Sequence, residues 1–180
     1  MTKRIQKRIS IRTANEVARI FWPDFIKVDG CIFAAFNWHG GDAGEARDKT
    51  EMECFINHTH LFDEFQNKAT VQRRVLCSET LDEIQETYDE KHPDFIRACE
   101  LGPRIARMWA AKLKIDFPDD RFRVYYTQYD NPIVRFHKVR SDEHEWLSND
   151  DLQAAIEPGF QSAVIYDTGY LERPVTKART

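Results

Sequence analysis

The chain has 180 residues and a mass of 21.2 kDa, a length at which one domain buries about 70% of its unfolded surface. Hydrophobic residues make up 42% and charged residues 31%, which excludes a disordered chain, a collagen-like repeat and a low-complexity linker. The net charge is −4, and no apolar run approaches the roughly 20 residues that cross a bilayer, so we expect no membrane partner.

The charge is unevenly distributed. Residues 1–12 carry five basic side chains and no acid, which leaves −9 for the rest of the chain. We interpret 1–12 as a basic N-terminal arm, 13–167 as a single α+β domain and 168–180 as a polar tail. The arm either contacts an anionic surface or is a solvated terminus, and its acid-free, Arg-rich composition also resembles a transit peptide.

The four cysteines lie 22 or 23 residues apart and form no C-x-x-C pair. Zinc ribbons and redox pairs need two thiols within a few residues, so neither kind of site is predicted. A disulfide framework is not expected without a secretory signal, so we predict four reduced thiols and a cytoplasmic protein.

The predicted elements follow from hydrophobic periodicity. Helices are expected where apolar residues recur at helical spacing, and strands where apolar and polar residues alternate. In chain order, we expect a helix over 13–22, a hairpin of 25–28 with 31–36, a helix over 50–65, an ambiguous helix or strand over 70–77, helices over 80–92, 93–99 and 103–116, a hairpin of 122–127 with 134–137, a helix over 149–156 and a strand over 162–166.

The order of these elements predicts the fold class. Helices grouped between strand pairs are typical of α+β proteins, whereas regular alternation would indicate a parallel sheet. We therefore predict an antiparallel sheet built from the two hairpins and the C-terminal strand, with helices packed on one face.

The second hairpin provides the first candidate site. If its apolar residues face the core, the other face presents rows of Arg, Tyr and His, which suit stacking on bases or binding anions. The glycine-rich loop after the first hairpin could frame this face, although its neighbouring acids argue against a phosphate loop. The predicted ligand-binding residues are Arg123, Tyr125, Tyr129, Arg135 and His137, with Trp38 and His39 from the loop. The alternative is a stabilising sheet surface, open or covered by a helix whose acids pair with the arginines.

The segment 54–64 provides the second candidate site. A divalent transition metal could be held by His58, His60, Asp63 and Glu64, because imidazole and carboxylate ligands suit Fe, Mn or Zn. On a strand, His58 and His60 would share one face. The alternative is a solvated helix face that includes Glu53, Asn57, His60 and Glu64. A nucleophilic Cys54–His58 pair is also conceivable, but a buried structural thiol is favoured.

Three functions follow from these sites. The leading interpretation is a cytoplasmic binding protein whose hairpin face holds a protein partner or an anionic small molecule. The alternative is a metal-assisted hydrolase that uses the histidine segment. The third is a single-stranded nucleic-acid binder that uses the basic arm, 1–12, and the Tyr-bearing hairpin, and it ranks last because the body of the chain is acidic. Each of them is compatible with a homodimer.

Overall fold

The computed structural model describes residues 10–40, 46–65, 68–78, 81–128, 131–147 and 162–169, with only the backbone described for 73–78, 81–86 and 162. The predicted helix over 149–156 lies outside these residues. The elements in chain order are α1 (Ile11–Phe21), β1 (Phe25–Val28), β2 (Cys31–Ala34), α2 (Lys49–Ile56), β3 (Thr59–His60), α3 (Leu61–Glu64), β4 (Thr70–Ser78), β5 (Leu81–Tyr88), α4 (Pro93–Asp116), β6 (Phe122–Gln128), β7 (Pro132–Lys138) and β8 (Ser162–Asp167).

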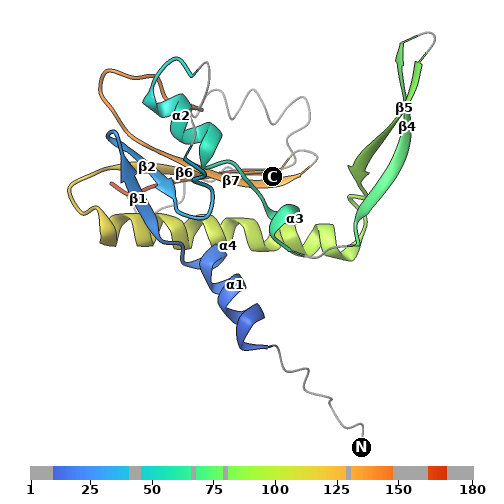
Figure 1. Cartoon of the computed structure of the whole chain (residues 1–180), viewed down its shortest axis with the longest axis horizontal. Coiled ribbons are helices and arrows are strands. Elements are labelled where there is room, and N and C mark those ends of the chain that lie inside the picture. The colour runs from blue at the N-terminus through green and yellow to red at the C-terminus, as the bar shows by residue number, and fades with distance from the viewer. Residues whose placement is uncertain are drawn as a thin grey trace, which may run out of the picture.

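Helices and antiparallel strands occur together, which confirms the α+β class. The main sheet has the strand order β3-β7-β6-β8, and β6 pairs along its length with both β7 and β8. The second hairpin and the C-terminal strand therefore form the sheet as predicted. The long helix α4 runs across one face of this sheet (Figure 1). No helix in the described ranges is both long and apolar enough to cross a membrane.

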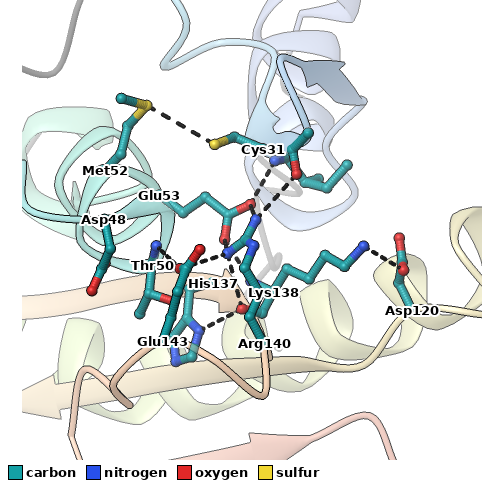
Figure 2. A network of polar contacts seen from close by, with 12 residues as sticks. Cys31, Asp48, Thr50, Met52, Glu53, Asp120, His137, Lys138, Arg140 and Glu143 are labelled. Atoms are coloured by element: carbon teal, nitrogen blue, oxygen red, sulfur yellow. Dashed lines mark hydrogen bonds and ion pairs between the residues drawn. The ribbon is translucent and has the colours of Figure 1, made fainter.

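The first hairpin, β1–β2, forms a two-stranded sheet of its own, so the prediction that both hairpins build one sheet was wrong. The reason lies in Glu53 of α2, which sits between the two sheets (Figure 2). Its carboxylate accepts the backbone N–H of Ile32 in β2 at 2.7 Å and that of Lys138 in β7 at 2.7 Å. Arg140 donates to both carboxylate oxygens at 2.8 and 2.9 Å. Side-chain hydrogen bonds thus replace a strand-to-strand ladder.

Asn57, one helical turn after Glu53, extends the same bridge. Its amide oxygen accepts the N–H of Ala34 at 2.9 Å, and its amide nitrogen donates to the carbonyl of Phe136 at 3.3 Å. Glu53 and Asn57 are both fully buried. The interpretation of these two residues as part of a solvated helix face was therefore wrong: their polar groups satisfy backbone groups at the inner edges of β2 and β7.

The main core lies between α4 and the sheet. Buried side chains of α4, including Ile105, Trp109 and Leu113, pack against the apolar face of β6 and β7. The indole of Trp109 also donates to the carbonyl of Ile20 at 2.7 Å, which fixes the end of α1 on this core. The alternation predicted for the second hairpin therefore assigns its core face correctly.

The helix α4 is one continuous element of 24 residues, although Gly102 and Pro103 predicted a break between two helices. Gly102 does not end the helix, because it is buried against β6. A Cβ at this position would lie 2.0 Å from Cε2 of Tyr126. The glycine therefore permits close contact between helix and strand, and the helix accommodates the hydrogen bond that Pro103 cannot donate.

The predicted helix over 80–92 was wrong, because residues 81–88 form strand β5. The capping pattern of Thr80 and Glu83 is a local signal, and pairing of β5 with β4 from Thr70↔Tyr88 to Ser78↔Leu81 overrides it. The ambiguous segment 70–77 is accordingly a strand. Figure 1 shows this hairpin projecting from the body of the molecule. At its base, the ring of Tyr88 stacks on that of Phe62, with centroids 4.3 Å apart.

Candidate functional site

The two candidate sites of the sequence meet at one edge of the main sheet. The helix predicted over 50–65 ends at Ile56, because Asn57 is held in the bridge between β2 and β7. The chain then runs extended through β3, where Thr59 pairs with Val134. This register places His58 beside Arg135 on the neighbouring strand β7. Because side chains alternate along a strand, His58 and His60 share one face.

The side chains of His58, His60 and Arg135 are in contact. The Nε2 atoms of the two imidazoles lie 2.7 Å apart, and Nη2 of Arg135 lies 3.4 Å from Nε2 of His58. A guanidinium can only donate hydrogen bonds, so Nε2 of His58 acts as the acceptor in this cluster. We refer to these three residues as the His–Arg site.

This arrangement holds His58 neutral. Burial, the largest effect, together with the neighbouring Arg135 and His60, lowers the pKa of His58 to about 4. Protonation at Nε2 would introduce a proton at the atom toward which Arg135 donates. At neutral pH the site therefore contains one positively charged guanidinium next to an uncharged imidazole.

Arg135 has no carboxylate partner among the described residues. Two nearby arginines of the same region differ in this respect, because Arg123 pairs with Glu145 and Arg140 pairs with Glu53. The guanidinium of Arg135 instead lies over the ring of Trp146, 5.4 Å from its centroid. Its Nε is buried and has no hydrogen-bond partner in the part of the chain that the structure describes.

Burial lowers the pKa of Arg135, but an arginine stays protonated under all ordinary conditions. The side chain of Arg135 is only partly buried, and that of His60 is 38% exposed. The site thus combines a positive charge and one N–H donor, Nε, that have no carboxylate or hydrogen-bond partner among the described residues, with an imidazole that is accessible to solvent. These are the properties of a site that accepts an oxyanion.

The pKa of His58 predicts a pH dependence of stability. The folded pKa of about 4 lies below the ordinary value of 6.5. Between these values the unfolded chain binds more protons, so the contribution of His58 is complete above pH 6.5 and is lost as the pH falls toward 4. Allowing for solvent exposure, we expect wild type to lose about 1–2 kcal/mol more than His58→Gln over this range. Urea unfolding of both proteins between these pH values measures the difference, and parallel stability curves would contradict it.

The remaining residues of the predicted hairpin face do not form an open surface. Tyr125 and His137 are almost fully buried, with the phenol oxygen 2.8 Å from Nε2 of His137. Trp146 and Leu147 pack over Tyr125. The burial of this face by residues 146–147 was not predicted, because no helix or strand was assigned to this segment. Burial raises the pKa of Tyr125 and lowers that of His137, so both are neutral structural groups. Tyr129 lies outside the described residues.

Trp38 and His39 do not frame the His–Arg site. The indole of Trp38 stacks on Phe33 of β2, with centroids 4.6 Å apart and planes at 12°. It lines a separate pocket next to the first hairpin. His39 is exposed, and no described side chain contacts its ring through a hydrogen bond or stacking.

The four predicted metal ligands do not surround one point. Nδ1 of His60 lies 3.3 Å from a carboxylate oxygen of Asp63, while its Nε2 contacts His58. Glu64 instead pairs with Arg19 at 3.4 Å. Within the described residues, no group of three or more His, Cys, Asp or Glu side chains is placed to hold a metal ion.

Cys54 is a buried structural thiol. It is fully inaccessible, and burial raises its pKa well above the ordinary value, so it is not an activated nucleophile. Cys31 and Cys99 are also free among the described side chains.

Sequence reasoning missed Trp146 and the structural role of Glu53. Trp146 belongs to an irregular segment without a periodic signal, and Glu53 resembled an exposed residue of an amphipathic helix.

Comparison with protein-family models, with curated proteins and with solved structures found no match.

Proposed function

We propose that this protein is a binding protein for a small molecule, which it holds by an anionic phosphate or carboxylate group at the His–Arg site. Arg135 would form charge-assisted hydrogen bonds with the anion, and His60 and His58 would lie beside it. The observation that carries the proposal is the partly buried Arg135, which lacks a carboxylate partner among the described residues and has an unused Nε.

The energetics of burial support this assignment. The partly buried guanidinium of Arg135 loses part of its hydration and gains little in return, because its hydrogen bond to Nε2 of His58 is long, at 3.4 Å, and it has no carboxylate partner among the described residues. The contact with Trp146 compensates for some of this loss through a cation–π interaction. A bound oxyanion would supply Arg135 with strong acceptors and a negative charge, and both would favour binding.

The binding of phosphate and acetate to wild type and Arg135→Gln tests the proposal. We expect either anion to shift the imidazole NMR signals of His58 and His60 in wild type at millimolar concentration. Loss of a charge-assisted pair should weaken this binding about tenfold or more in Arg135→Gln. Arg97→Gln is the matched control, since Arg97 is exposed on α4 and pairs only with Asp94 among the described residues. Unchanged histidine signals in wild type, or equal binding by both variants, would reject the proposal.

The metal-assisted hydrolase is the second candidate function, and the same histidine signals test the metal site that it requires. The convergence of the Nε2 atoms of His58 and His60 favours this second candidate, since two imidazole nitrogens on one face can share a cation. Arg135 opposes it, because its positive charge lies 3.4 Å from one of these nitrogens. A titration with Zn²⁺ that shifts both histidines at equimolar metal, while phosphate does not, would replace the anion proposal by the metal site.

A further inference from the structure

A pocket of about 380 Å³ lies next to the first hairpin and is separate from the His–Arg site. It is partly open to solvent and is lined by residues of the β1–β2 hairpin, the start of α2 and Trp38, none of which belongs to the His–Arg site. Its volume falls in the range of about 300–1,000 Å³ that is typical of small-molecule sites.

The lining of the pocket is polarizable. It includes the rings of Phe33 and Trp38, which stack on each other. Cys31 and Met52 contribute sulfur atoms 3.9 Å apart to the lining. Aromatic rings stack favourably on indole and make favourable contacts with sulfur, so these walls suit a planar aromatic group. Burial raises the pKa of Cys31, which keeps its thiol neutral against such a ligand.

Among the described residues that line the pocket, Lys49 carries a positive charge. Lys49, the first residue of α2, lines it and has no carboxylate partner among the described residues. Its Nζ lies over the hairpin turn, 3.0 Å from where a Cβ on Gly30 would be. The carboxylate of Asp29, in the same turn, also lines the pocket and weakens the attraction of Lys49 for an anion. Because Lys49 is exposed and has no carboxylate partner among the described residues, an anionic group of a ligand would pair with its Nζ.

We infer that this pocket is a second binding site, for an aromatic molecule that carries an anionic group. The ring lies between Trp38 and the sulfur atoms of Cys31 and Met52, and the anionic group faces Lys49. This inference does not rest on the anion site at Arg135, because the two sites share no residue.

Titration with 2-naphthoate and with the neutral 2-naphthamide tests the inference. Both compounds are expected to shift the indole N–H signal of Trp38 and the methyl signal of Met52. Lys49→Gln should weaken naphthoate binding about two- to fivefold, the size of an exposed ion pair, and leave naphthamide binding unchanged. Trp38→Leu should weaken the binding of both compounds.

The controls separate this site from the one proposed above. Naphthoate binding is followed at Trp38 and Met52, which line this pocket and do not belong to the His–Arg site, so failure of the anion proposal leaves this test intact. Lys49 begins a helix at the surface, so Lys49→Gln is expected to fold normally even if Trp38→Leu does not. Absence of shifts at Trp38 and Met52 in wild type, or equal effects of Lys49→Gln on the acid and the amide, would overturn the inference.

Discussion

Replacement of Glu53 by alanine is expected to lower the free energy of unfolding by about 3–5 kcal/mol, the typical cost of removing one partner from a buried ion pair. Three consequences combine in this variant. Arg140 loses the carboxylate that accepts from both of its terminal nitrogens, and the backbone N–H groups of Ile32 and Lys138 lose their acceptor. The hairpin β1–β2 also loses a main connection to the four-stranded sheet. Chemical denaturation measures the change.

Two further variants give this prediction its controls. Glu51→Ala removes a carboxylate from the same helix, where it pairs with the exposed Arg47, and should cost less than about 1 kcal/mol. Glu53→Gln retains one acceptor oxygen, so its loss of unfolding free energy should lie between those of Glu53→Ala and Glu51→Ala. Burial raises the pKa of Glu53, although Arg140 and the two N–H groups oppose this effect. A cost for Glu53→Ala no larger than that of Glu51→Ala would show that the bridge between the sheets does not depend on this carboxylate.

Gly102→Ala is expected to destabilise the protein by about 2–3 kcal/mol, as overpacking does in a close-packed core. An alanine in a helix is ordinarily favoured over glycine by about 1 kcal/mol, so the sign of the effect is diagnostic. The added Cβ would lie 2.0 Å from Cε2 and 2.4 Å from Cδ2 of Tyr126. Because Tyr126 is fully buried in β6, its ring cannot move aside without disturbing the core. Thermal and urea unfolding both measure this change.

A double-mutant cycle with Tyr126→Leu identifies the cause. If the clash with the ring is responsible, Gly102→Ala should cost less in the Tyr126→Leu background, with a coupling of about 1 kcal/mol or more. Glu100→Ala, an exposed change on the same helix, should stay within about 0.5 kcal/mol of wild type. A stabilising effect of Gly102→Ala would mean that helix propensity exceeds the cost of the contact.

Local sequence signals predicted the elements whose structure depends on nearby residues. The turn at Asp29 and Gly30 has positive φ angles of 49° and 82°, as expected for the hairpin that these residues predict. Period-two alternation identified β6 and β7. These signals succeed because the alternating apolar residues that predict a strand are the same residues that pack into the core.

Signals of the same kind failed where distant contacts decide the structure. The capping pattern at Thr80 indicates a helix, but pairing with β4 makes 81–88 a strand. Gly102 and Pro103 indicate a helix boundary, but Tyr126, 24 positions away, explains the glycine within a continuous helix. A single sequence contains no information on such contacts unless the pairing of elements is already known.

The candidate site was predictable as separate residues and not as an arrangement. Arg135, His58 and His60 each stood out by chemical type, yet they were assigned to two different functions. Only the pairing of β3 with β7 brings them together. The burial of Tyr125 depends on Trp146 and Leu147, which belong to a segment without periodicity.

The most direct test of the His–Arg site is an NMR titration of the imidazole of His58 against pH, with and without phosphate. The pKa of His58 is about 4 in the free protein, because burial and Arg135 disfavour a second positive charge. A phosphate bound to Arg135 would reverse that effect, so we predict that it raises the pKa of His58 by about 1 or more in wild type and leaves it unchanged in Arg135→Gln. Titration curves of His58 that coincide with and without phosphate would contradict anion binding at this site.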